Sequence, residues 1–277
     1  MFAFPIALST GCFYKKRLFD LLEPIRQNGF SALEITASIA HLDYRDLMDV
    51  REAGRQISDL GLEVCCFHGP FGLHADFTSP GAEERQSALK DILLALEAAV
   101  ALNARYFILH PGPVIGHHLP LREVSRRREN AVSSLRRIAE LCRATDTVLL
   151  LENMLPHQLL GRISDLLWFR EAIDPEMVGL CFDTGHASLG GDLYMIAHKL
   201  AEYVRVIHAH DNLVADDHLP PGKGRIDWRR LLKVLVASGF DGLISLELSG
   251  EVDDDLKQLT EACQAREFLQ EILLGMG

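Results

Sequence analysis

Short runs of aliphatic and β-branched residues recur along the chain, and longer segments with apolar residues at helical spacing separate them. The short runs predict strands at Phe4–Leu8, Ala32–Thr36, Leu62–Phe67, Tyr106–His110, Val148–Glu152, Val178–Phe182, Val204–His208 and Leu243–Leu248. Several runs are apolar throughout, which is typical of parallel strands buried on both faces. Helices are predicted at Ala82–Ala101, Leu121–Arg143, Asp192–Tyr203, Asp227–Ser238 and Glu251–Leu274.

This alternation of strands and helices predicts a (β/α)8 TIM barrel, because eight such units in roughly 250 residues are what that fold requires. No linker, low-complexity stretch or change in composition divides the chain, so residues 1–277 are predicted to form a single domain. A doubly wound open sheet is the alternative. Its dinucleotide-binding version is disfavoured, since no Gly-x-Gly-x-x-Gly follows the first predicted strand.

A histidine or a carboxylate stands at the end of each of six consecutive predicted strands. These residues are His68, His110, Glu152, Asp183, His208 and Glu247. In a barrel the loops after the strands open on one face, so these side chains are expected to converge there. One such residue alone is more often a helix cap or a loop hydrogen-bonding group. A buried group of carboxylates, however, needs a cation or hydrogen bonds to offset its desolvation, and the pattern therefore predicts a metal centre.

Three further candidate ligands lie in the loops, namely His186 after Asp183 and the pair Asp216 and His218. Imidazole and carboxylate ligands favour zinc or manganese as the divalent cofactor, with magnesium, cobalt and iron as alternatives. His210 lies two residues after His208, and we expect it to be a hydrogen-bonding partner of His208 or Asp183.

Composition adds expectations about compartment and partners. The net charge of −11 disfavours broad electrostatic attraction to nucleic acid or to an anionic membrane. The six cysteines form no Cys-x-x-Cys pair, which is typical of reduced thiols and favours a cytoplasmic location. No apolar run approaches the roughly 20 residues of a membrane span. A small-molecule substrate is therefore expected, and the oligomeric state stays open.

Five motifs occur together and in order along the chain. They are Leu151-Glu152-Asn153, Asp183-Thr184-Gly185-His186, His208-x-x-Asp211, Asp216-x-His218 ahead of Gly222-x-Gly224, and the closing Glu247. As an ordered set they resemble the xylose isomerase-like TIM barrels, the superfamily that holds sugar isomerases and epimerases as well as endonuclease IV. The resemblance covers nearly the whole chain.

The resemblance implies one of two site layouts. In the isomerase layout one divalent metal is held by Glu152, Asp183, His208 and Glu247. The two glutamates would then move a proton at a carbon next to a carbonyl, and His186 would contact a substrate hydroxyl. The endonuclease layout adds ligands for a trinuclear zinc cluster, which map to His68, His110, His186, Asp216 and His218.

Loop composition separates these functions. An apurinic endonuclease needs arginine, glutamine and an aromatic wedge to bend DNA and reach its target. The loop at residues 37–41 has neither arginine nor lysine, and the loop at residues 69–76 has one aromatic residue and no arginine. We therefore expect an isomerase or epimerase acting on a sugar or sugar phosphate. A zinc-dependent phosphodiesterase is the alternative, and a non-catalytic metal-binding barrel is a third possibility.

Overall fold

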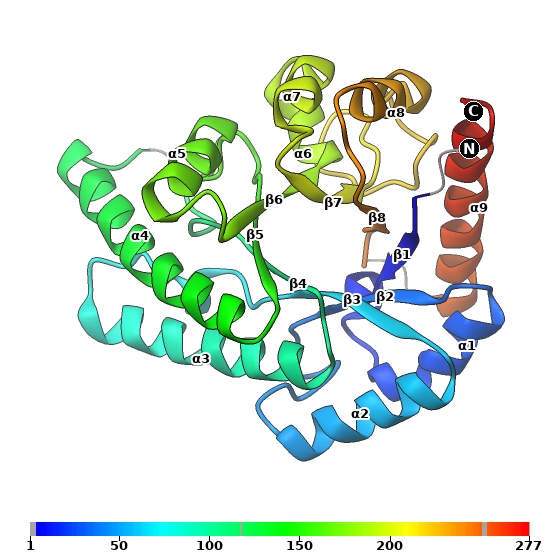
Figure 1. Ribbon diagram of the computed structural model, residues 1–277, viewed down its shortest axis with the longest axis horizontal. Coiled ribbons are helices and arrows are strands. Elements are labelled where there is room, and N and C mark those ends of the chain that lie inside the picture. The colour runs from blue at the N-terminus through cyan, green and yellow to red at the C-terminus, as the bar shows by residue number, and fades with distance from the viewer. Residues whose placement is uncertain (1–3, 117, 251–253, 277) are drawn as a thin grey trace.

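The computed structural model describes residues 4–116, 118–250 and 254–276. Parallel strands close into one barrel in chain order, with the helices arranged around them (Figure 1). The strands are β1 (Ile6–Ser9), β2 (Ala32–Thr36), β3 (Glu63–His68), β4 (Tyr106–Leu109), β5 (Val148–Glu152), β6 (Val178–Asp183), β7 (Val204–Ala209) and β8 (Leu243–Leu246). The predicted (β/α)8 fold is confirmed, and strand ends differ from the predicted ones by one or two residues at several strands.

The helices follow the strands as the fold requires. They are α1 (Leu22–Gln27), α2 (Leu47–Asp59), α3 (Ala82–Ala101), α4 (Leu121–Ala144), α5 (Ile163–Ile173), α6 (Thr184–Gly190), α7 (Leu193–Leu200), α8 (Trp228–Ala237) and α9 (Asp255–Leu274), with 3-10 turns at Thr10–Phe13, Leu18–Asp20 and Leu73–Ala75. The sequence pattern does not predict the helices α1, α2, α5 and α6. Residues 251–253 of the last predicted helix lie outside the described residues. Within those residues no helix has the length and apolar character needed to cross a bilayer.

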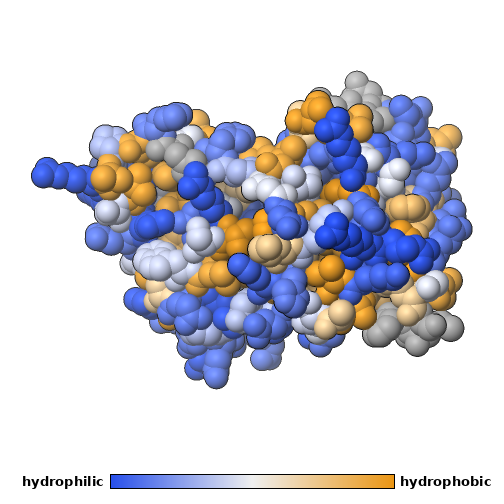
Figure 2. All heavy atoms as spheres, turned by 90° about the horizontal axis from the view of Figure 1, so that it is seen from above, coloured by the Kyte–Doolittle hydropathy of each residue, from blue (hydrophilic) through white to orange (hydrophobic). Residues whose placement is uncertain are grey.

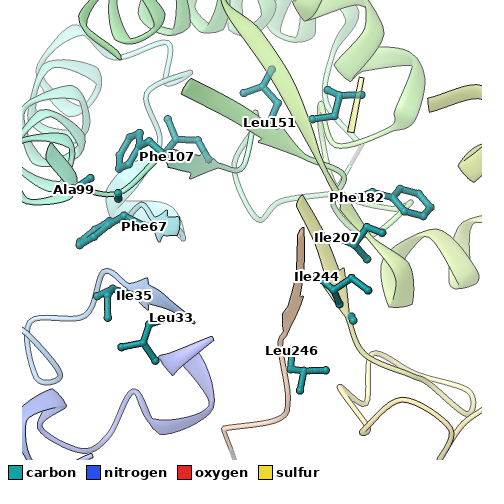
Figure 3. Packing of buried hydrophobic residues seen from close by; sticks show 14 of the residues in the cluster. Leu33, Ile35, Phe67, Ala99, Phe107, Leu151, Phe182, Ile207, Ile244 and Leu246 are labelled. Carbon is teal, nitrogen blue, oxygen red and sulfur yellow. The ribbon is translucent and has the colours of Figure 1, made fainter. Parts of the chain in front are cut away.

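Two apolar layers flank the sheet, because successive side chains of a strand point to opposite faces. The outer layer packs under the helices and includes Phe107, Leu151 and Phe182 (Figure 3). The inner layer fills the barrel and includes Leu150 and Cys181. Inward positions further along the same strands carry the polar residues of the barrel mouth.

The loop between β7 and α8 is held by one buried carboxylate. Asp211 is fully buried and accepts hydrogen bonds from Gly222 N (3.1 Å), Ile226 N (3.1 Å) and the indole Nε1 of Trp228 (3.0 Å). The neighbouring Asn212 accepts from the backbone amides of residues 217 and 218 at 2.8 and 3.2 Å. The loop is therefore a fixed support for Asp216 and His218, although it contains no helix or strand.

Several apolar side chains on this side of the molecule reach solvent. Leu189, Met195, Leu213 and Val214 are 37%, 53%, 49% and 75% exposed. Figure 2 looks onto the side formed by α7 and α8 and shows apolar side chains interspersed with hydrophilic ones.

Replacing the anchoring carboxylate should destabilise the protein strongly. Asp211→Ala leaves the buried donors Ile226 N and Trp228 Nε1 without this acceptor, so the free energy of unfolding should fall by about 2–4 kcal/mol. Urea unfolding followed by circular dichroism measures the change. Asp217→Ala is the matched control, because Asp217 accepts only from amides of the exposed turn, including that of Leu213 at 2.8 Å. Equal losses in the two variants would contradict the anchoring role of Asp211.

Candidate metal centre

The candidate ligands come together at the mouth of the barrel in four groups, three of which share Glu152. The groups are Glu152 with Asp183, His208 and Glu247; His68 with His110 and Glu152; His186 with His210, Asp216 and His218; and Glu152 with Cys181 and His208. Within each group the potential ligand atoms all lie within 4.8 Å of one another. Every ligand predicted from the sequence belongs to at least one group.

The inner group (Glu152, Asp183, His208 and Glu247) has the features of a cation site. Nδ1 of His208 lies 3.3 Å from Oε1 of Glu152 and 3.0 Å from Oε2 of Glu247. This Nδ1 and this Oε2 are both buried and make no hydrogen bond. Buried polar atoms are nearly always paired, so unpaired atoms that converge on one point fit a divalent cation bound between them.

Glu34 orients the central histidine and is absent from the predicted ligands. It lies on β2, is fully buried, and accepts from Nε2 of His208 (3.0 Å) and from the hydroxyl of Ser9 (2.8 Å). A carboxylate can only accept, so Nε2 carries the proton and Nδ1 is left free for the centre. A single charged residue inside the apolar run Ala32–Thr36 was the signal for it in the sequence.

The first outer group is His68, His110 and Glu152. Nδ1 of His68 donates to the carbonyl of Gly69 at 2.9 Å, which turns its Nε2 toward Oε2 of Glu152 at 3.1 Å. Nε2 of His110 lies 3.4 Å from the same oxygen. The ring of Phe71 is 5.5 Å from both imidazole rings and covers this group from the loop after β3.

The second outer group combines His186 of α6 with His210, Asp216 and His218 from the loop between β7 and α8. Nδ1 of His186 donates to the carbonyl of Asn153 at 2.9 Å, and Nδ1 of His218 donates to that of Glu247 at 3.1 Å. Their Nε2 atoms each lie 3.4 Å from one carboxylate oxygen of Asp216. Because a carbonyl only accepts, both rings present an Nε2 to the position that Asp216 also faces.

His210 is a partner of Asp183 and not of His208, which resolves the two alternatives left by the sequence. Its Nε2 lies 3.0 and 2.9 Å from the two oxygens of Asp183, and its ring stacks on that of His218 with centroids 3.8 Å apart. The ring also explains Gly185, since a Cβ there would lie 2.0 Å from Cε1 of His210. The glycine of the Asp-Thr-Gly-His motif thus makes room for a buried imidazole.

Charge balance shifts the pKa of the buried groups. Burial lowers the pKa of an imidazole, but the hydrogen bonds and charges of the surrounding carboxylates outweigh this effect. As a result the pKa is raised to about 8 for His68, about 9 for His218 and about 10 for His186. Burial would raise the pKa of Glu152, but His208 and His110 hold it well below its usual value. Protons on the imidazoles therefore balance the carboxylates whenever no cation does so.

A cavity of about 400 Å³ opens beside His186. Its lining includes Asn153, Met154, Arg162 and Ile196, which combine apolar surface with an amide and a guanidinium group. It offers space for a small molecule next to the second outer group.

A closed (β/α)8 barrel with histidine and carboxylate groups at the carboxyl ends of its strands belongs to the class of barrels that can bind divalent metals at the mouth. Within that class, residues 22–272 match the family described as the xylose isomerase-like TIM barrel. The match covers most of the chain, and the protein belongs to this family.

The relatives of this chain include proteins named as sugar epimerases and proteins named as endonucleases. A solved structure titled a D-tagatose 3-epimerase-like protein has 27% sequence identity, a TM-score of 0.81, and coverage of 96% of this chain and 98% of its own. The 3-dehydro-D-guloside 4-epimerase of Escherichia coli is 23% identical over 87% of this chain and 91% of its own. A probable endonuclease 4 of Mycoplasmoides gallisepticum is 24% identical over 76% of this chain and 73% of its own.

Glu34→Gln should weaken metal binding without unfolding the protein. The amide can offer its NH2 group to Nε2 of His208, which favours the tautomer whose Nδ1 carries the proton and cannot bind a cation. Losing such a partner typically lowers metal affinity about 10–100-fold. Calorimetric titration of the metal-free protein with Mn²⁺ measures the affinity. Ser9→Ala, which removes the other donor to Glu34, is the control and should cause a smaller loss.

The metal-free protein should become less stable as the pH rises from about 6.5 to 10. The pKa values of His68, His186 and His218 are higher in the folded chain than the ordinary value of 6.5, so their contribution is complete below that value and disappears as the pH passes through 8 to 10. Urea unfolding at a series of pH values tests this. Asp216→Asn should flatten the dependence, because it removes the carboxylate that His186 and His218 share. A stability that does not fall over this range would contradict the assignment.

Proposed function

We propose that this protein is a divalent-metal-dependent isomerase or epimerase acting on a sugar or a sugar-like hydroxy ketone. The observation that carries the proposal is the pair of carboxylates on the inner group. Glu152 from β5 and Glu247 from the end of β8 approach Nδ1 of His208 on β7 at 3.3 and 3.0 Å. Two carboxylates beside one candidate cation position can remove a proton from a substrate carbon and return one to it.

The two glutamates differ in how they meet the solvent. The side chain of Glu247 is 20% exposed at the mouth, whereas that of Glu152 is 1% exposed. In the proposed reaction one carboxylate removes the proton from the carbon next to the substrate carbonyl, and the other returns a proton to that carbon or its neighbour. A divalent cation held by Glu152, Asp183, His208 and Glu247 would polarise the adjacent substrate oxygens and so acidify that C–H bond.

His186 supports binding in this proposal. Its imidazole borders both the second outer group and the cavity that includes Arg162. A substrate hydroxyl would hydrogen-bond to it, while the part of the substrate remote from the reacting carbon would occupy the cavity. Positioning of this kind converts binding contacts into correct placement of the reacting carbon between the carboxylates.

The loops at the mouth favour a small substrate over DNA. Arg45, the one arginine of the loop between β2 and α2, is paired with Asp91 at 2.7 Å. The loop after β3 exposes Phe71 and Leu73, which are 47% and 72% exposed, and has no arginine. Among the relatives described above, two are named as a sugar epimerase or an epimerase-like protein. Their names support the same choice.

A zinc-dependent phosphodiesterase remains the alternative, and a specific observation favours it. The two outer groups add ligands that a one-metal isomerase does not require. The first shares Glu152 with the inner group, and in the second Nδ1 of His186 lies 3.5 Å from Oδ1 of Asp183. Several cations in such an arrangement neutralise phosphate oxygens and activate water. The relative named as a probable endonuclease points the same way.

Solvent exchange tests the isomerase. With Mn²⁺ and a panel of ketohexoses, ketopentoses and their phosphates in deuterium oxide, deuterium should enter the carbon next to the carbonyl of the true substrate. Glu247→Gln should slow the exchange about 10²–10⁴-fold, because it removes one of the two bases. Glu52→Gln is the matched control, since Glu52 lies on the surface of α2 and pairs with Arg55. Proton magnetic resonance follows the exchange.

Metal content and DNA cleavage decide between the two functions. Near one equivalent of metal in protein purified without added metal fits the isomerase. Two to three equivalents of zinc, together with nicking of duplex DNA at an abasic site that Glu152→Gln abolishes, would overturn it. Absence of exchange in the whole sugar panel, alongside cleavage of phosphodiesters, would have the same consequence.

A further inference from the structure

The inner group has a thiol on the side that faces the barrel interior. Cys181 lies two residues before Asp183 on β6, so both side chains point inward, and it pairs in register with Glu152 of β5. Cys181 belongs to the inner apolar layer and is 1% exposed. Its Sγ and the ligand atoms of Glu152 and His208 lie within 4.8 Å of one another.

This sulfur group shares two of its three members with the inner group. Glu152 and His208 belong to both, and the groups differ in that one adds Asp183 and Glu247 while the other adds Cys181. His208 is fully buried, and its Nδ1 makes no hydrogen bond. His208 therefore offers one unpaired nitrogen, and its single lone pair can bind one cation at a time, in one group or the other.

We infer that Glu152, Cys181 and His208 form a second metal position beneath the inner group, selective for soft and borderline cations such as Cd²⁺ and Zn²⁺. This inference rests on the proposed metal-dependent function. Thiolate ligands select such ions, whereas carboxylates and water suit Mg²⁺ and Mn²⁺. Binding forms a metal–sulfur bond and breaks the S–H bond of Cys181, and the proton passes to the solvent without any change of oxidation state.

The two positions differ in what the substrate can reach. An ion between Asp183 and Glu247 lies at the mouth, next to the partly exposed carboxylate of Glu247. An ion drawn down to Cys181 lies among apolar side chains of the inner layer and leaves Glu247 without its partner. Cd²⁺ should therefore occupy the protein without supporting proton transfer, and Mn²⁺ should support it.

Cadmium titration of the metal-free protein tests the inference. Wild type should develop the ultraviolet charge-transfer band of a cadmium–thiolate bond as Cd²⁺ binds, and Cys181→Ser should not. Cys66→Ser is the matched control, because Cys66 is equally buried in the inner layer but belongs to none of the ligand groups found among the described residues. Cys181→Ala provides a second variant in case the serine hydroxyl disturbs packing.

Calorimetry with two ions provides the second readout. Cys181→Ser should weaken Cd²⁺ binding at least tenfold, as much as the loss of a ligand's hydrogen-bonding partner costs, and leave Mn²⁺ binding unchanged. Cadmium binding without the thiolate band, or a band that persists in Cys181→Ser, would overturn the sulfur site alone. No binding of either ion by the wild type would overturn the sulfur site and the proposed function together.

Discussion

Compensation of buried negative charge is the constraint on which the mouth of this barrel depends. Glu34, Glu152 and Asp183 are at most 1% exposed, and carboxylates so deeply buried are stable only beside positive charge or hydrogen-bond donors. The neighbouring imidazoles supply that charge, and their raised pKa values are its signature. A divalent cation can take over the same role from several protons at once. Folding and proton binding are thus linked through the same atoms that the proposed cation would use.

The backbone determines which nitrogen each imidazole presents. Gly69, Asn153 and Glu247 each offer a carbonyl from the turn that follows β3, β5 or β8, and each carbonyl accepts a ring N–H. In the same way, Nε2 of His208 donates its proton to the carboxylate of Glu34. These acceptors therefore fix the tautomer of each histidine in the absence of a ligand. The second nitrogen of each ring then points toward the mouth of the barrel.

Much of the fold and the ligand set could be predicted because both depend on strand periodicity. Apolar runs marked the strands, and polar residues directly after them marked the mouth. The helix α2 was missed because only Val50, Ala53 and Ile57 are buried along its polar sequence, and α6 because its Asp-Thr-Gly-His opening is typical of a turn. The only local sign of Glu34 was a single charge within an apolar run, and Cys181 resembles a small apolar residue. Their importance comes from neighbouring strands, which local patterns cannot show.

The two parts of the site are supported by different kinds of structure, and this bears on how the family can diversify. Glu152, Asp183 and His208 stand on strands whose loss would open the barrel. Asp216 and His218 stand on an irregular loop that Asp211 ties down. Insertions or deletions in such a loop leave the barrel intact. Remodelling this one loop can therefore remove or replace the candidate ligands Asp216 and His218 while those on the strands stay in place.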